Sequence, residues 1–393
     1  MSARKIKEGL YGVGAVDWDR RMFDDLIPLP DGTSYNAYLI QGSEKTALVD
    51  TVDPAKSHVL LGHLRELGLQ RLDYVIANHA EQDHSGTLPQ VLAHYPEAQV
   101  VCTPKCQQML VDLLLVAPDR VLAVDDGATL SLGDRTLEFI HAPWVHWPET
   151  MLTYLREDQI LFSCDFLGSH LATTDLYATD EGRAYEAAKR YYAEIMMPFR
   201  KVIQKNLAKI QGYEIAMIAP SHGPMYDRPE FILEAYRHWV LDEPQNIVVL
   251  PYISMHGTTR VMVYRLLDAL VALGVTVKLF NLAVTDIGEL AMSLVDAATI
   301  VIGSPTVLGG AHPNVVYAAY LANVLRPKAK FVSIIGSYGW GGKMVPQLAG
   351  LISNLKVEVL DPVVVKGYPR DEDFEALDRL AATIASKHGT LAG

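Results

Sequence analysis

The hydrophobic pattern of the chain changes near residue 242. Before that point, short apolar or alternating runs that are typical of strands are separated by turns and by a few helical segments. The main predicted strands are 34–40, 46–50, 74–78, 99–102, 136–140, 151–155, 159–163 and 215–219. Helical patterns cover 57–67, 88–94 and a long stretch over 182–210. Strands in runs with a few helices between them indicate an α+β arrangement or a sandwich of sheets covered by helices.

From residue 246 onward, the pattern becomes a regular alternation of apolar runs and helices. The apolar runs are 247–253, 275–282, 299–303, 331–335 and 357–360. The helices that follow them are 259–273, 287–296, 313–325, 342–354 and 371–387. Such strands, apolar throughout, predict a doubly wound five-stranded parallel sheet covered on both faces. We therefore predict two domains, 1–241 and 246–393, joined by a short polar linker that contains a proline.

Composition and charge exclude several classes of protein. With 393 residues, half of them hydrophobic, the chain is long enough for two or three domains with full cores. A net charge of −12 argues against nucleic acid or an anionic membrane as the main partner. Neither a signal-peptide pattern nor a membrane-spanning apolar stretch is visible. Cys102, Cys106 and Cys164 give no even disulfide framework, so we interpret them as buried thiols and predict a soluble cytoplasmic protein.

A cluster of metal-ligating side chains follows the predicted strand 74–78 directly. Residues 79–84 read His-Ala-Glu-Gln-Asp-His. Because alternate side chains of an extended backbone share a face, we expect His79, Glu81 and Asp83 to converge and His84 to point toward a neighbouring position. So many carboxylates and imidazoles are unfavourable in a protein interior unless a cation compensates them. The array therefore suits two metal ions side by side.

Three further candidate ligands lie in loops at the ends of predicted strands. His146 lies between two strand-like runs, Asp165 follows the strand 159–163, and His222 lies in a turn after 215–219. Loops at strand ends are common carriers of metal ligands because the sheet holds the start of each loop. Each residue alone would be an ordinary loop residue. Together with the 79–84 cluster, they predict one metal centre.

This order of ligands resembles that of the metallo-β-lactamase-like domain. The motif is His-x-Glu-x-Asp-His-x-Gly, followed by His146, Asp165 and a Ser-His-Gly loop. Most of that superfamily has a histidine at the position of Glu81, and an anionic oxygen ligand there favours iron. With a flavodoxin-like domain after it, the whole chain resembles the flavodiiron proteins. The resemblance implies an αββα metallo-β-lactamase-like sandwich followed by a flavodoxin-like doubly wound domain.

The resemblance also implies a role for each ligand in a diiron centre. Asp165 and an oxo or hydroxo group would bridge the two irons. The ligands of the first iron would be His79, Glu81 and His146. The ligands of the second would be Asp83, His84 and His222, although the histidine matching His84 is not bound to metal in every family member.

Other polar residues nearby are interpreted first as structural. Asp50, Asp53 and Glu149 would support the fold or orient the ligands. His170 is either a neighbour of the metal pocket or a packed side chain, and both readings stay open. The histidines at 58, 63, 94 and 141 have no array around them and are interpreted as core or surface residues.

Three loops in the second part predict a bound FMN. They follow the first, third and fourth strands, where a ligand would lie over the carboxyl edge of the sheet. Glycines and hydroxyls at a helix start suit a phosphate, while Tyr338 and Trp340 offer flat faces to a flavin ring. The residues predicted to bind FMN are Ser254, Met255, His256, Gly257, Thr258, Thr259, Ser304, Pro305, Thr306, Leu308, Gly309, Ser337, Tyr338, Gly339, Trp340 and Gly341. The chain has no G-x-G-x-x-G motif followed by an acidic residue, so NAD is not the predicted cofactor.

Taken with the resemblance, the two sites predict an oxidoreductase. It would reduce dioxygen to water, nitric oxide to nitrous oxide, or both, with electrons passed through FMN. Family resemblance implies a head-to-tail homodimer, which could pair into a tetramer, and an external donor such as a rubredoxin or a reduced deazaflavin. Two alternatives remain: a dinuclear zinc hydrolase with a flavodoxin-like module, and a non-catalytic electron carrier or gas sensor. The preferred gas and the donor are left open.

Overall fold

The computed structural model describes residues 2–391 of the chain. It consists of two compact units. The first contains the residues up to Tyr192 and Phe199–His238, and the second contains Ala193–Pro198 and the residues from Trp239 onward. Among the described residues, no helix is long and apolar enough to cross a membrane.

The first unit contains a seven-stranded mixed sheet. Its strands lie in the order β1 (Arg4–Lys7), β2 (Leu10–Gly12), β7 (Tyr38–Gln41), β8 (Thr46–Val49), β9 (Tyr74–Ile76), β10 (Gln99–Cys102) and β11 (Val121–Ala123). Leu39, Leu48 and Val75 on one face belong to a core that also contains the apolar sides of three helices. These helices are α1 (Ser57–Glu66), α3 (Leu88–His94) and α4 (Pro104–Leu114). Because side chains alternate along each strand, the neighbours of these residues point to the opposite face of the sheet.

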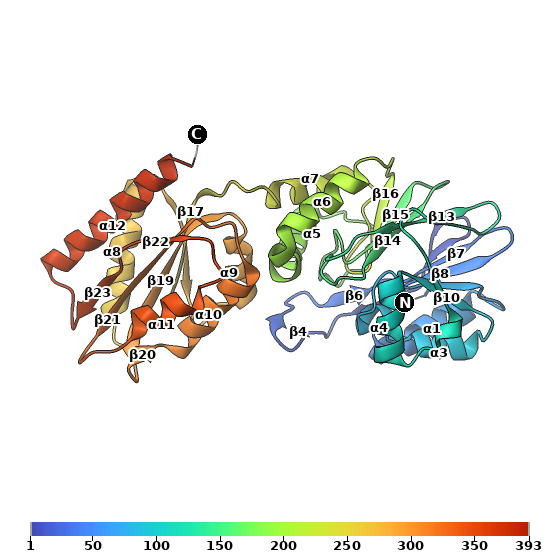
Figure 1. Ribbon diagram of the computed structural model, residues 1–393, viewed down its shortest axis with the longest axis horizontal. Helices are drawn as coiled ribbons and strands as arrows, with labels where there is room; N and C mark the ends of the chain where they lie inside the picture. The colour runs from blue at the N-terminus through green and yellow to red at the C-terminus, as the bar shows by residue number, and fades with distance from the viewer. Residues whose placement is uncertain (1, 392–393) are drawn as a thin grey trace. The chain divides into compact units, whose positions relative to one another are not determined.

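A second sheet of five strands packs against that opposite face. Its order is β12 (Thr129–Ser131), β13 (Thr136–His141), β14 (Met151–Leu155), β15 (Ile160–Cys164) and β16 (Met217–Pro220). Ile40, Val49 and Ile76 of the first sheet share a core with Phe139 and Phe162 of the second. Figure 1 shows three helices beside the second sheet: α5 (Glu181–Tyr191), α6 (Arg200–Ile210) and α7 (Pro229–Trp239). The first unit is thus the expected αββα sandwich.

Two features of the chain before residue 242 differ from the sequence prediction. The hairpin β4 (Met22–Phe23) and β5 (Ile27–Pro28) and the pair β3 (Ala15–Asp17) and β6 (Thr33–Tyr35) include strands too short to give a pattern. The single helix predicted over 182–210 is wrong. Its place is taken by α5, a π-helical turn and a 3₁₀ turn over residues 192–199, and α6. Pro198 lies in this break. Proline has no N–H to donate and its ring clashes with the preceding helical turn, so a regular helix cannot continue through it.

The second unit contains a doubly wound parallel sheet, as predicted. The main strands lie in the order β18 (Thr276–Asn281), β17 (Gln245–Tyr252), β19 (Ala297–Val307) and β21 (Phe331–Tyr338). The fifth position is shared by β22 (Glu358–Val359) and β23 (Val363–Lys366), which both pair in parallel with β21. The predicted strand over 357–360 therefore corresponds to β22, and β23 was not predicted.

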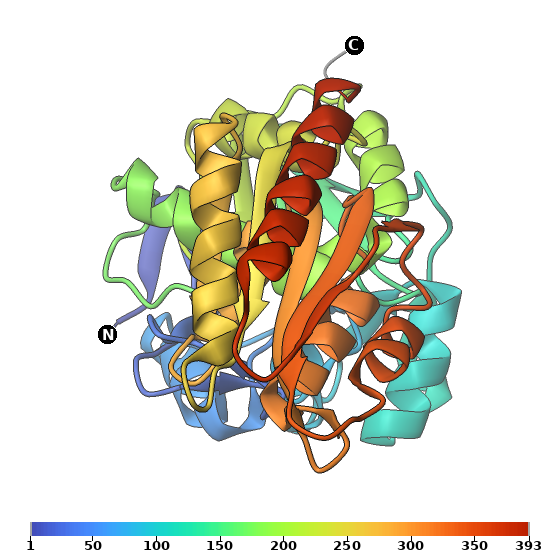
Figure 2. The same cartoon turned by 90° about the vertical axis from the view of Figure 1, so that its left-hand side faces the viewer.

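Helices cover both faces of this sheet. On one face, α8 (Thr258–Ala272) and α12 (Asp371–Gly389) lie side by side (Figure 2). On the other lie α9 (Ile287–Leu294), α10 (Pro313–Leu325) and α11 (Met344–Leu351) (Figure 1). This arrangement places every strand-to-helix loop at the carboxyl edge of the sheet, where ligands of such folds bind.

A buried histidine near the end of α12 makes the stability of the second unit depend on pH. His388 is 5% exposed, and its Nδ1 and Nε2 lie 2.7 Å from Asn246 Oδ1 and from Thr299 Oγ1. Burial lowers the pKa of His388 below its ordinary value of 6.5. The folded state therefore favours the neutral ring, and the unfolded chain binds more protons once the pH falls below that value.

We expect the stabilisation by His388 to be complete above about pH 6.5 and to weaken as the pH falls. Urea unfolding of the wild type and of His388→Gln, followed from about pH 8 to about pH 5, measures this effect. The difference in free energy of unfolding between the two proteins should shrink toward acid pH. A difference that stays constant over this range would contradict the assignment.

Candidate functional site

Two groups of potential metal ligands meet in the first unit. All of them lie beyond strand ends: His79 and Glu81 after β9, His146 between β13 and β14, Asp165 after β15 and His222 after β16. Asp83 and His84 lie on the short helix α2 (Gln82–Ser85). The first group is His79, Glu81, His146 and Asp165, and the second is Asp83, His84 and His222. Within each group, the potential ligand atoms lie within 4.8 Å of one another.

Glu81 lies at the centre of the first group. Its Oε2 is 3.1 Å from His79 Nε2 and 3.0 Å from His146 Nε2. Asp165 Oδ2 completes this group, at 3.5 Å from His79 Nε2 and 3.3 Å from His146 Nε2. Two imidazole nitrogens and two carboxylate oxygens therefore converge on one position.

The second group faces the other oxygen of the same aspartate. Asp165 Oδ1 lies 3.0 Å from His84 Nε2 and 3.3 Å from His222 Nε2. Asp83 offers Oδ1 at 3.2 Å from His84 Nε2 and Oδ2 at 3.2 Å from His222 Nε2. One carboxylate thus lies between two ligand groups, an arrangement that suits two adjacent cations.

The expected convergence of residues 79, 81 and 83 is wrong at Asp83. The backbone is extended at Glu81, with ψ 143°, but it turns into α2 at Gln82. A helical turn ends the alternation of side chains that an extended backbone would continue. Asp83 consequently lies with His84 in the second group, while His79 and Glu81 belong to the first.

Several buried atoms at the centre of the cluster show that it suits a cation. Asp83 Oδ1, His84 Nε2 and Asp165 Oδ2 lie close to one another and to His146 but make no hydrogen bond of acceptable geometry among the described residues. Buried polar atoms are normally paired, so three such atoms facing one space call for a group that accepts their lone pairs. The donors are imidazole nitrogens and hard carboxylate oxygens, a set suited to non-haem iron.

The electrostatics of the cluster lead to the same conclusion. Burial alone would lower the pKa of His146 and His222, but the bonds and charges of the carboxylates raise these pKa values to about 9 and about 10. Burial would raise the pKa of Asp165, but His84 and the other imidazoles hold it well below its ordinary value. The buried carboxylates therefore need a compensating positive charge nearby, and either protons on the histidines or metal ions can supply it.

The loops predicted to bind FMN lie at the carboxyl edge of the sheet in the second unit. Gly257, with φ +89°, caps the start of α8 and lets the backbone turn into the helix. Thr259 Oγ1 lies 3.3 Å from Ser337 Oγ, which places the first and third loops together. Lys343 N donates to Gly309 O at 2.7 Å, and this bond places the second loop next to the end of the third.

The middle region differs from the predicted loop over 304–310. Strand β19 continues to Val307 and forms a hairpin with β20 (Gly310–Ala311), so Leu308 and Gly309 alone make the turn. Both have positive φ, of 50° and 83°. Trp340 and Leu308 are almost completely exposed. These apolar side chains are therefore available to a ligand or to another surface.

The comparisons with known proteins agree with this geometry. Residues 33–223 match the model of the ODP family beta lactamase. The chain is 37% identical to the nitric oxide reductase of Moorella thermoacetica over 97% of this chain and 98% of the relative. It is 31% identical to the rubredoxin-oxygen oxidoreductase of Megalodesulfovibrio gigas over 98% of each chain.

Solved structures extend the likeness to both units. The rubredoxin oxygen:oxidoreductase from Desulfovibrio gigas matches with a TM-score of 0.95 and 30% identity, over the whole of both chains. The flavodiiron protein from Giardia intestinalis matches with a TM-score of 0.93 and 30% identity, over 100% of this chain and 98% of that one. The chain belongs to the flavodiiron protein family. It is an oxidoreductase whose cofactors are a diiron centre and FMN, as predicted, and the two alternative classes are not supported.

Buried acceptors orient the histidines of this flavodiiron protein from behind. Glu149 Oε1 lies 2.7 Å from His79 Nδ1 and also accepts from Ala80 N at 3.0 Å. The carbonyl oxygen of Ser34 lies 2.6 Å from His222 Nδ1. If each Nδ1 carries the proton, each Nε2 is left free to face the metal position. The reading of Glu149 as a residue that orients a ligand agrees with these contacts.

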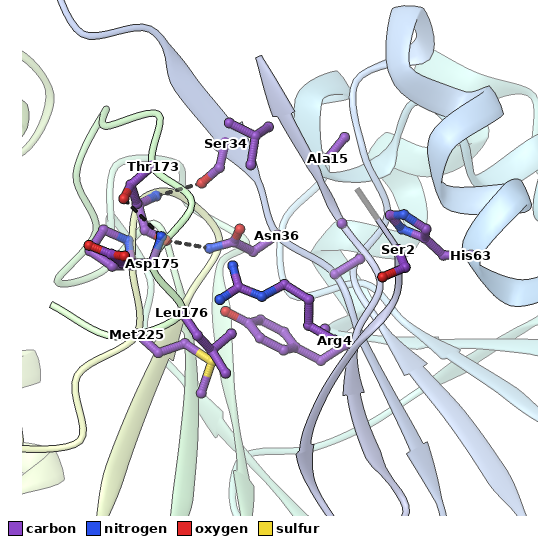
Figure 3. Close-up of a pocket in the computed structure, with 17 residues that line it drawn as sticks. Ser2, Arg4, Ala15, Ser34, Asn36, His63, Thr173, Asp175, Leu176 and Met225 are labelled. Atoms are coloured by element: carbon purple, nitrogen blue, oxygen red, sulfur yellow. Dashed lines mark hydrogen bonds between the residues drawn. The ribbon is translucent and has the colours of Figure 1, made fainter. Parts of the chain in front are cut away.

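The loop that carries His222 is also fixed to the strands behind it. Ser34 Oγ accepts from Gly223 N at 2.8 Å, and Asn36 Nδ2 donates to Gly223 O at 2.7 Å and to Pro220 O at 2.9 Å. Figure 3 shows Ser34 and Asn36 on the wall of a cavity behind this loop. The loop is therefore held at Pro220 and Gly223, on either side of His222, which keeps its ring in place.

The sequence did not point to Tyr191, and it did not decide whether His170 is a neighbour of the metal pocket or a packed side chain. Tyr191, on α5, donates its hydroxyl to Asp165 Oδ1 at 2.8 Å. The ring centroid of His170 lies 4.9 Å from that of His222, and its Nδ1 is 2.9 Å from Thr33 Oγ1. Burial, together with the charge of His222, lowers the pKa of His170 well below its ordinary value. His170 is thus a neutral neighbour of the ligands.

The remaining residues singled out in the sequence lie outside the two ligand groups. Asp50 accepts from Asn78 N at 2.8 Å, and Asp53 caps a short 3₁₀ helix through Ala55 N. His94 and His141 bond to backbone carbonyl oxygens. The cysteines Cys102, Cys106 and Cys164 are free and buried.

A cavity of about 320 Å³ reaches the ligands from one side. Glu81 and Asp83 form part of its lining, so it contacts both ligand groups. Phe23, Trp147 and His170 line it as well. Its volume exceeds what a diatomic gas needs, so the cavity can admit such a molecule to the ligands without fitting closely around it.

Proposed function

We propose that this flavodiiron protein reduces dioxygen to water, nitric oxide to nitrous oxide, or both, at a diiron centre in its first unit. One iron would be held by His79, Glu81 and His146, the other by Asp83, His84 and His222, with Asp165 between them. The observation that carries this proposal is the position of Asp165, whose two oxygens lie at 3.0–3.5 Å from four histidine nitrogens in two groups.

The side chains around the centre have separate tasks in this proposal. Iron and FMN, when bound, supply the position for the gas and the electrons. Glu149 and the Ser34 carbonyl hold the Nε2 atoms of His79 and His222 toward the metal position. The Tyr191 hydroxyl donates a hydrogen bond to Asp165 Oδ1 across 2.8 Å and holds that oxygen in place. Phe23 and Trp147 give the cavity apolar walls beside its charged lining residues.

The flavin is assigned to the three loops of the second unit. The proposed FMN residues are those predicted in the sequence, at 254–259, 304–306, 308–309 and 337–341. Their support is the closeness of the loops at the carboxyl edge of the sheet and the start of α8 at Thr258. The phosphate would face the α8 start, and the ring would lie near Tyr338 and Trp340.

Assembly, electron donor and location complete the proposal. We assign the diiron domain to 1–241, the FMN domain to 246–393, and a head-to-tail homodimer to the active form, because the two sites lie in different units of one chain. Relatives named rubredoxin-oxygen oxidoreductase and coenzyme F420H(2) oxidase, the latter 33% identical and from Methanothermobacter marburgensis, favour a rubredoxin or a reduced deazaflavin as donor. The free buried thiols fit a cytoplasmic location.

Protein purified from iron-supplied cells provides the test. We expect two irons and one FMN per chain, and rapid consumption of at least one gas when the anaerobically reduced protein meets dioxygen and nitric oxide in separate experiments. The ratio of the two turnover rates then decides the physiological gas. Two zinc ions per chain together with ester or lactam hydrolysis would contradict the proposal.

A further inference from the structure

Trp147 contacts the proposed ligands of one iron only. Its ring centroid lies 5.0 Å from that of His79 with an interplanar angle of 87°, and 6.2 Å from that of His146 with an angle of 68°. Both are edge-to-face contacts, in which the positive edge of one ring meets the negative face of the other. Trp147 also lines the cavity that reaches Glu81. It thus supports the two imidazoles of the first group directly.

The loop that carries Trp147 is fixed by hydrogen bonds at its backbone. Trp144 N donates to Trp147 O at 2.7 Å. Thr150 Oγ1 lies 3.2 Å from the same oxygen and 2.9 Å from Val145 O. Trp144 has a φ of +64°, a strained conformation for a bulky residue, and its ring stacks on Phe199 at 5.7 Å. The tight loop holds Trp147 in position, so its ring acts as a fixed wall.

The second group of ligands has a different set of aromatic neighbours. The ring centroid of His222 lies 5.9 Å from that of Tyr35, 4.9 Å from that of His170 and 5.9 Å from that of Tyr191. No ring contact between Trp147 and His84 or His222 occurs in the described part of the chain. Trp147 therefore contacts only the first group, although the two groups also meet each other through the rings of His79 and His84, whose centroids are 5.3 Å apart.

We propose that Trp147 is a positioning residue for the iron held by His79, Glu81 and His146, and that the retention of this iron depends on Trp147 more than the retention of the other does. The inference rests on the proposed diiron function. Without the indole, both imidazoles of the first group lose an aromatic contact, and among the described residues only His79 keeps a hydrogen bond from behind, to Glu149. Tyr35, His170 and Tyr191 still contact the ring of His222. Loss of Trp147 should thus release one iron selectively.

The test is the release of iron from the fully loaded, reduced holoprotein to a ferrous chelator. In Trp147→Leu, we expect one iron to leave about tenfold faster than in the wild type, as loss of an outer contact to a ligand does. The other iron should leave within about twofold of its wild-type rate. An anomalous difference map of the half-stripped protein should show the remaining iron at Asp83, His84 and His222.

Matched variants separate positioning from a general loosening of the fold. Trp147→Phe keeps a flat ring and should bring the fast phase back to within about threefold of the wild type. Tyr35→Leu, on the other wall, should accelerate the other iron instead. If the leucine variant does not fold, Trp147→Met tests the same loss of a planar ring.

Three outcomes would overturn the inference, and the first two are distinguishable from the third. Equal acceleration of both irons, or unchanged release of both in loaded Trp147→Leu, would reject the positioning role and leave the diiron proposal intact. A wild-type protein that binds fewer than two irons when iron is supplied would reject the proposed function, and this inference with it.

Discussion

Replacing Asp165 by alanine should abolish gas consumption by the reduced protein. Its two oxygens lie between the two ligand groups, 3.0 Å from His84 Nε2 and 3.3 Å from His146 Nε2, so no other side chain can take over both contacts. The remaining ligands would have to hold two cations without the shared negative charge that offsets their repulsion. The loss in turnover should exceed the roughly 10- to 100-fold effect of removing a residue behind a ligand.

The measurement combines iron content with the rates of dioxygen and nitric oxide consumption. Asp165→Asn is the matched substitution, because it keeps the size of the side chain and removes the charge, and it should also be severely impaired. Asp119→Ala removes an exposed carboxylate outside the site and should behave like the wild type. Unchanged turnover in Asp165→Ala would reject a catalytic diiron site.

The second large effect is expected at Glu149, which never touches the metal position. Its side chain is fully buried, and Oε1 is 2.7 Å from His79 Nδ1 and 3.0 Å from Ala80 N. In Glu149→Ala, the imidazole loses the partner that sets its tautomer, and buried N–H groups are left unpaired at a cost of about 1–3 kcal/mol each. Iron affinity should fall roughly 10- to 100-fold.

Glu149→Gln provides the control for this substitution. Its amide oxygen can accept from both His79 and Ala80, so the orientation of His79 is kept while the charge is lost. We expect the glutamine variant to retain iron clearly better than the alanine variant when both are dialysed against the same chelator. Equal iron loss in the two variants would show that the charge of Glu149, and not its hydrogen bonding, supports the site.

Sequence reasoning reached the ligands because their signal is local and dense. Four of the seven lie within residues 79–84, and the others follow strands whose apolar pattern is clear. Tyr191, Trp147 and Ser34 have no such signal. Tyr191 lies in an amphipathic helix, Trp147 adjoins a ligand without a motif of its own, and Ser34 acts through a backbone carbonyl. Their roles depend on tertiary contacts that no spacing in the sequence encodes.

The fold, too, was predicted correctly where the signal is local and less well where it depends on tertiary contacts. The strands β17, β19 and β21 are buried on both faces, so their continuous apolar runs identify them in the sequence. Strand β1, Arg4–Lys7, is polar and partly exposed, so no hydrophobic pattern marks it in the sequence. It is a strand because its backbone pairs with that of β2. Likewise, the 182–210 pattern stays amphipathic through Pro198, although the helix does not continue there. Local pattern predicts an element's type more reliably than its interruptions.

The central claim is that seven side chains from separate strand ends hold two irons. Anomalous diffraction at the iron edge, on crystals of protein purified from iron-supplied cells, tests it most directly. The account predicts two iron peaks, one at His79, Glu81 and His146 and one at Asp83, His84 and His222, with Asp165 bonded to both. A single peak, two zinc ions, or iron bound elsewhere on the chain would contradict it.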